Sequence, residues 1–138
     1  MTEITGGCLC GAVRFSAETD APISLACHCR DCQYVSGGAP AVVVVVPSAA
    51  LRVTGDTRSF RATADSGTEV HRAFCPDCGT PLFAGNAAHP EVVSIKLGAL
   101  DDPAAFAPQS HIWTASAQPW HHIDRALPYS ERNPQLGG

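Results

Sequence analysis

The stretch FCPDCGTPLF, residues 74–83, holds two cysteines three positions apart in what reads as a tight turn. Two thiolates at this spacing bind one zinc ion when the turn between them is sharp, as in a zinc knuckle. Pro76 shapes the turn, and Gly79 lets the backbone curve so that amide N–H groups point at the sulfurs. A knuckle supplies two ligands while a closed tetrahedral site needs four, so the stretch predicts a second cysteine pair elsewhere.

That second pair lies in GGCLCGAV, residues 6–13, where Cys8 and Cys10 are two positions apart. In an extended segment residues i and i+2 share a face, so both thiols can point at the same ion. The neighbouring glycines give the backbone room to bend. We therefore predict a structural zinc on Cys8, Cys10, Cys75 and Cys78 that ties the N-terminal segment to the middle of the chain.

The remaining three cysteines lie together in CHCRDC, residues 27–32. Three protein ligands and an open position are the arrangement expected of a catalytic zinc site. Three thiolates leave the site with a net negative charge, which disfavours activation of water but still allows a thiol to bind as a thiolate. We therefore predict that Cys27, Cys29 and Cys32 form a catalytic zinc site that presents a small thiol as a nucleophile.

Other interpretations of the cysteines stay open. The CHCRDC cluster could be a redox or regulatory thiol set, or a vestigial site beside one working structural zinc. The protein would then be a noncatalytic zinc domain whose surface binds another protein. Plain core packing and disulfides fit less well, because the cysteines form close-set clusters and seven of them cannot all pair.

The composition favours a cytoplasmic globular protein. The chain has 138 residues, a formal net charge of −4 and scattered basic residues, which disfavours a nucleic-acid-binding class. The start MTEITGGCLC does not resemble a signal peptide, and the longest apolar stretch, APAVVVVVP, is far shorter than the roughly 20 residues of a membrane helix. Cytoplasmic thiols stay reduced, which favours metal ligands over disulfides. The sequence gives no oligomeric state.

Short strands between Gly and Pro residues dominate the expected secondary structure. Val13, Phe15 and Ala17 alternate with polar residues as in a half-buried strand, whereas the valines at 42–46 suit a strand buried on both faces. One short helical turn is expected to begin at Pro103. Further strands are expected near 23–27, 57–63, 69–75, 91–97 and 111–116. The sequence predicts one all-β domain with short helical turns over residues 1–131, and a flexible C-terminal tail over 132–138.

Three cysteine signatures, GGCLCGAVRF, CHCRDCQYVSGG and FCPDCGTPLF, resemble those of the glutathione-dependent formaldehyde-activating enzyme family, which includes centromere protein V. The later stretches VSIKLGALDDP and HIWTASAQPWHHIDRALPYSE are similar to the usual ending of that family, so the resemblance covers about residues 4–131. The resemblance implies a β-tent fold with a structural zinc on the residues matching Cys8, Cys10, Cys75 and Cys78. It also implies a catalytic zinc on those matching Cys27, Cys29 and Cys32, with condensation of formaldehyde and glutathione by carbon–sulfur lyase chemistry.

Residues around CHCRDC are candidate substrate contacts. Arg30 could bind a carboxylate of an anionic thiol such as glutathione, although a surface charge paired with Asp31 or another acid is the simpler interpretation. Gln33 adjoins the last cysteine of the cluster, and Ser36 and Gly37 could line the open face of the metal.

The histidines are expected to play supporting parts. His28 should project away from the ligands between which it lies, toward solvent or a neighbouring side chain. A pocket wall is one interpretation of the segment HIWTASAQPWHH, residues 111–122, but packing of its tryptophans in the core is the default expectation.

Overall fold

The computed structural model describes residues 1–64 and 66–133. The chain folds into two compact units, each built from two separate stretches of sequence. The first unit holds residues 1–23 and 44–106, and the second holds residues 24–43 with the chain from residue 107 onward. Residues in strands far outnumber residues in helical turns in the described chain, so the predicted all-β fold with short helical turns is confirmed. The single domain over residues 1–131 stays a prediction.

Strands from both stretches of the first unit form a three-stranded antiparallel sheet. Its order is β1–β2–β5, with bounds Thr2–Gly7, Arg14–Thr19 and Leu51–Thr54. The predicted alternation in the second strand is confirmed, because Val13, Phe15 and Ala17 are all buried. The loop that joins β1 to β2 carries Cys8 and Cys10, so the paired strands hold both thiols at one end of this sheet.

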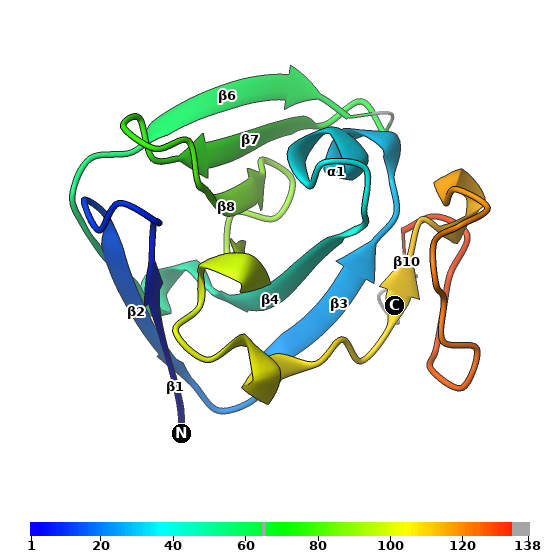
Figure 1. Cartoon of the computed structure of the whole chain (residues 1–138), viewed down its shortest axis with the longest axis horizontal. Helices are drawn as coiled ribbons and strands as arrows, with labels where there is room; N and C mark the ends of the chain where they lie inside the picture. The colour runs from blue at the N-terminus through cyan, green and yellow to red at the C-terminus, as the bar shows by residue number, and fades with distance from the viewer. Residues whose placement is uncertain (65, 134–138) are drawn as a thin grey trace. The chain divides into compact units, whose positions relative to one another are not determined.

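The first unit also contains a run of strands in the order β9–β8–β7–β6. Their bounds are Val92–Lys96, Pro81–Asn86, Glu69–Phe74 and Arg58–Thr63. Strands β6, β7 and β8 lie side by side and pair antiparallel (Figure 1). The turn of the β7–β8 hairpin carries Cys75 and Cys78, and the bulge between Ala73 and Phe74 comes just before it. The predicted strand pair at 57–63 and 69–75 is confirmed, while Asp65 in its turn lies outside the described residues.

The valine run forms β4, Ala41–Pro47. Val43, Val44 and Val46 are buried, and the two other valines are partly exposed. Consecutive buried side chains at Val43 and Val44 point to opposite faces, so this strand is covered on both faces as predicted.

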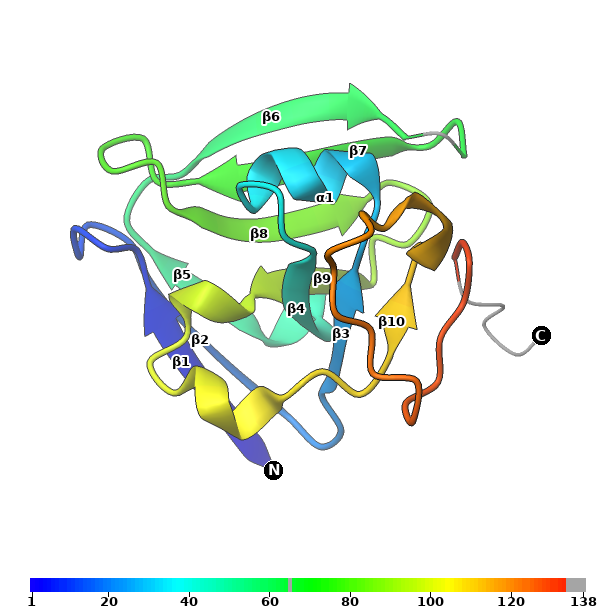
Figure 2. The same ribbon diagram turned by 45° about the vertical axis from the view of Figure 1, so that its right-hand side comes forward.

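The second unit is built on β3, Ile23–Cys27, with the two-residue strand β10, His111–Ile112, parallel beside it (Figure 2). A short helix, α1, Arg30–Val35, follows β3 and was not expected from the sequence. Its N-cap is Cys29, whose sulfur accepts a hydrogen bond from the Cys32 amide at 3.3 Å. The chain between β3 and α1 therefore carries the CHCRDC cluster.

The remaining regular elements are 3₁₀ turns at Ser48–Ala50, Leu97–Ala99, Pro103–Phe106 and Thr114–Ser116. The third confirms the helical turn predicted to begin at Pro103. No helix in the described ranges is long and apolar enough to cross a membrane.

The expected core packing of the tryptophans is wrong for Trp120, whose side chain is 68% exposed. Trp113 is partly buried, and its indole N–H donates to Oδ1 of Asn133 at 2.7 Å. Its backbone amide donates to the carbonyl of Arg132 at 3.1 Å. These two partners belong to the predicted tail, and residues 134–138 of that tail lie outside the described residues.

Candidate metal centres

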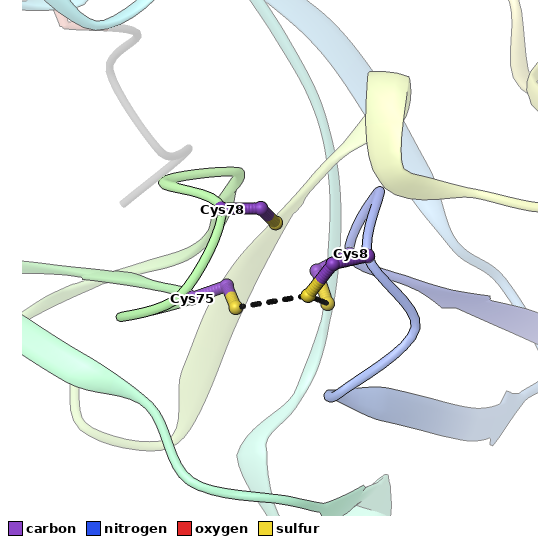
Figure 3. A group of neighbouring side chains, drawn as sticks. Cys8, Cys75 and Cys78 are labelled. Carbon is purple, nitrogen blue, oxygen red and sulfur yellow. Dashed lines mark hydrogen bonds between the residues drawn. The ribbon is translucent and has the colours of Figure 1, made fainter.

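Two loops of the first unit bring four cysteines together. Cys8 comes from the loop after β1, whereas Cys75 and Cys78 come from the β7–β8 turn, and their side chains point toward one another (Figure 3). The sulfurs of these three residues and of Cys10 all lie within 4.8 Å of one another. The set inferred from residue spacing is thus one spatial cluster, although its two pairs are 65 residues apart in sequence.

The spacing of these sulfurs fits a tetrahedral metal site. Four thiolates about 2.3 Å from a central zinc ion lie about 3.8 Å from one another. The Cys8 and Cys10 sulfurs are 3.6 Å apart, and those of Cys10 and Cys75 are 3.7 Å apart. A disulfide would bring two sulfurs to about 2.05 Å. The described chain includes every cysteine, and none of them forms a disulfide.

Neighbouring groups form hydrogen bonds to three of the four sulfurs. The Val13 amide donates to the Cys8 sulfur at 3.2 Å, and the Asp77 amide donates to the Cys75 sulfur at 3.4 Å. The hydroxyl of Thr80 lies 3.1 Å from the Cys78 sulfur. Its hydrogen bond and that of the Thr80 amide lower the pKa of Cys78 to about 5. Donors aimed at sulfur stabilise a thiolate, which is the form that binds metal.

The predicted role of Gly79 in this turn is also observed. Gly79 has φ of 76°, a left-handed conformation that favours glycine, and its amide donates to the Cys75 carbonyl at 2.8 Å. This closes the turn that carries Cys75 and Cys78 on one side of the candidate site.

The second unit holds the three-cysteine cluster. Cys27 ends β3, Cys29 caps α1, and Cys32 lies in the first turn of that helix. Their sulfurs lie within 4.8 Å of one another, and no further His, Cys, Asp or Glu joins the group in the described ranges. Cys32 is buried, whereas Cys27 and Cys29 are partly exposed, so solvent reaches the cluster.

Hydrogen bonds among the three thiols dominate protonation in this cluster. The hydrogen bonds of Cys27 with Cys29 and then with Cys32, together with burial, raise the pKa of Cys27 strongly. Three adjacent thiolates cannot coexist without a compensating cation. A dipositive metal ion would supply that charge, and both cysteine clusters have the thiol groups that could hold one.

Residues 3–116 match the sequence model of a family described as "Glutathione-dependent formaldehyde-activating enzyme". The chain belongs to this family. The resemblance inferred from the three cysteine signatures is therefore confirmed, and both cysteine clusters fall inside the matched range.

Two curated relatives carry the name "Putative glutathione-dependent formaldehyde-activating enzyme". The protein from Halomonas elongata is 28% identical over 127 residues, which cover 88% of this chain and 81% of the relative. The protein from Emericella nidulans is 32% identical over 76 residues, which cover 55% of this chain and 38% of the relative. The crystal structure of a Rhodobacter sphaeroides protein matches with a TM-score of 0.55 and 23% identity. It covers 70% of this chain and 87% of that one, and it supports the fold alone.

The predicted substrate contacts of this family member lie in very different environments. Arg30 is exposed on α1, with its guanidinium 5.2 Å above the ring of Tyr34. Ser36 caps the end of the helix, and Gly37 beyond it is exposed. Gln33 is only 2% exposed and has protein partners on both ends of its side-chain amide. The site roles of all four stay predictions.

The solvent-facing alternative for His28 is wrong, because this side chain is fully buried. Its ring hydrogen-bonds to two other histidines, His111 and His121. Burial and, after it, the charges of these two neighbours lower the pKa of His28 to about 4. Sequence reasoning missed this cluster, although the histidines near residues 111–122 were a visible signal.

Proposed function

We propose that this protein is a zinc-dependent carbon–sulfur lyase that condenses a small thiol, glutathione or a relative of it, with formaldehyde. The observation that carries this proposal is the group of three thiols in the second unit, which no fourth ligand completes in the described chain. A metal bound there has a coordination position left for an external ligand. The four-cysteine cluster is proposed as a closed structural zinc site in the first unit.

The chain's own residues prepare the three-cysteine site for a thiol. Cys27, Cys29 and Cys32 present their sulfurs on one short turn, and the amide of Cys32 holds the Cys29 sulfur at 3.3 Å. Cys27, Cys29 and Cys32 would hold a zinc ion, whose charge would favour the thiolate form of a substrate sulfur as its proton leaves to solvent. The substrate thiolate adds to the carbon of formaldehyde, the carbonyl π bond breaks, and the oxygen takes a proton from solvent to give the S-hydroxymethyl product. Such thiol chemistry needs a reducing compartment, and we propose the cytoplasm.

Exchange spectroscopy tests this proposal directly. Added protein should accelerate the exchange between glutathione and S-(hydroxymethyl)glutathione in the presence of formaldehyde, and the Cys29→Ser variant should return the rate to its uncatalysed value. The measurement is two-dimensional NMR exchange at several protein concentrations. Equal rates for wild type and Cys29→Ser would exclude this reaction for these substrates. In that case the noncatalytic zinc domain becomes the better proposal.

We propose that Arg30 binds the carboxylate of an anionic thiol. The guanidinium is exposed beside the cluster, donates to Oε1 of Gln33 at 2.5 Å and lies over Tyr34, which fixes its direction. The Arg30→Ala variant should raise the KM for glutathione roughly two- to fivefold, because an exposed ion pair contributes up to about 1 kcal/mol. The KM for the uncharged thiol 2-mercaptoethanol should not change. A parallel rise for both thiols would instead indicate general damage to the helix.

A further inference from the structure

Three histidines of the second unit form a continuous hydrogen-bonded chain beside the three-cysteine cluster. His28 Nε2 lies 3.0 Å from His111 Nδ1, and His28 Nδ1 lies 3.0 Å from His121 Nδ1. At the far end, His121 Nε2 lies 2.8 Å from the carbonyl oxygen of Gly38. His28, at the centre, is fully buried and stands between two of the cysteines.

Backbone groups determine which ring nitrogens of the three histidines carry protons. The Asp124 amide donates to His111 Nε2 at 3.3 Å, so Nε2 accepts and the proton of neutral His111 is on Nδ1. The Gln118 amide donates to His121 Nδ1 at 3.3 Å, so the proton of neutral His121 is on Nε2, where it donates to Gly38. His28 must then accept at Nε2 from His111 and donate from Nδ1 to His121.

This assignment satisfies every polar atom of the three rings with neutral imidazoles. The hydrogen bonds run in one direction, from the Asp124 amide through His111, His28 and His121 to the Gly38 carbonyl. The opposite direction would place an imidazole N–H against the Asp124 amide, another against the Gln118 amide, and a bare nitrogen against a carbonyl oxygen. The three histidines therefore form a directional hydrogen-bond network in a buried position. Networks of this kind are rigid when every member has its hydrogen-bond partners.

The backbone of His28 is held as firmly as its ring. The side-chain amide of Gln33 donates to the His28 carbonyl at 2.8 Å and to the Ser116 carbonyl at 3.0 Å. The oxygen of the same amide accepts from Arg30 and from Gln118. Residue 28 is thus restrained at its ring and at its carbonyl, and the directions in which its neighbours Cys27 and Cys29 project depend on it.

We propose that the chain of His111, His28 and His121 is a positioning device for the three-cysteine site. It connects the turn that carries the thiols to the loop at Gly38, which follows α1 and borders the exposed Gly37. Its direction lets each ring be a neutral acceptor for one neighbour and a donor to the next. The link to catalysis rests on the proposed function, whereas the effect on metal affinity follows from the geometry of the site.

A matched pair of variants at His111 tests the proposal. The amide of asparagine lies near the place of a histidine Nδ1, and that of glutamine lies near the place of Nε2. His111→Asn therefore keeps a donor for His28, while His111→Gln keeps only the acceptor for Asp124. Partners that orient metal ligands typically contribute 10- to 100-fold to metal affinity. We expect about that loss in Co²⁺ affinity for His111→Gln and a loss below about threefold for His111→Asn.

The affinity is measured by following the thiolate-to-cobalt absorption of the three-cysteine site in protein whose four-cysteine site is filled with zinc. Equal affinities for the two folded variants would overturn the proposal. If His111→Gln fails to fold, the His121 pair replaces it, because His121→Asn keeps the acceptor for His28 and His121→Gln keeps only the donor to Gly38.

Nitrogen-15 NMR provides a readout that does not depend on activity. The wild-type protein should show the Nδ1–H tautomer for His28 and His111 and the Nε2–H tautomer for His121. Any other tautomer pattern would overturn the directional chain. Neither the cobalt titration nor the tautomer measurement uses a substrate. A negative exchange assay would therefore contradict the lyase proposal without affecting the histidine proposal, and failure of the histidine proposal would not affect the lyase proposal.

Discussion

Replacing Cys75 with serine is expected to leave the protein unfolded or insoluble. Cys75 is fully buried, and its sulfur lies 3.7 Å from that of Cys10 in the four-cysteine cluster. Structural zinc contributes about 10–16 kcal/mol of apparent binding free energy in small peptides, and whole domains are stable by about 5–15 kcal/mol. Loss of one of four ligands therefore removes a contribution as large as the stability of the fold. Circular dichroism and the soluble yield after expression measure the effect.

The matched control is Cys29→Ser, which alters a thiol of the other cluster. Because Cys29 is partly exposed and caps a helix of only six residues, this variant should remain folded, with a melting temperature near that of the wild type. A soluble Cys75→Ser protein with an unchanged melting temperature would show that the four-cysteine cluster does not hold a stabilising metal.

Metal content is expected to be two zinc ions per chain, released in two separate steps by a chelator. The three-cysteine site has fewer protein ligands, so it should lose its ion first, and the circular dichroism spectrum should not change. Release from the four-cysteine site should unfold the protein, because its ligands join two loops that are distant in sequence. A chromogenic chelator measures the stoichiometry while circular dichroism follows the fold.

The Cys32→Ser variant provides the control for this titration. It should contain one zinc ion per chain and release it in a single step that coincides with unfolding. One ion per chain in the wild type, released together with unfolding, would contradict the two-site proposal. It would favour the noncatalytic interpretation, with an idle or redox-active cluster at residues 27–32.

The division of the cysteines into four and three followed from local spacing and from the four ligands that a closed zinc site needs. A C-x-x-C turn and a C-x-C strand segment each orient two thiols by backbone geometry alone, which is why Cys75 pairs with Cys78 and Cys8 with Cys10. The alternation of Val13, Phe15 and Ala17 likewise reflects the two-residue period of a strand, and burial confirms it.

The environment of Gln33 and of His28 did not follow from spacing. Both were assigned by their position beside cysteines, yet both side chains are buried. The helix α1 also escaped prediction, because its six residues are too few for a periodic pattern and its cap is a cysteine rather than serine, threonine or aspartate. Trp120 was expected in the core because of its size, but no local pattern reports which face of a loop meets solvent.

The sequence by itself determined the family, the strand-rich fold and the local grouping of the cysteines into two pairs and one triple, since these depend on spacing between near neighbours in the chain. Tertiary structure decided the partners of the polar side chains around the three thiols. His28 meets His111 across 83 positions of sequence and His121 across 93. Pairing of β3 with β10 brings these segments together, and hydrogen bonds over such separations have no periodicity that a sequence can display.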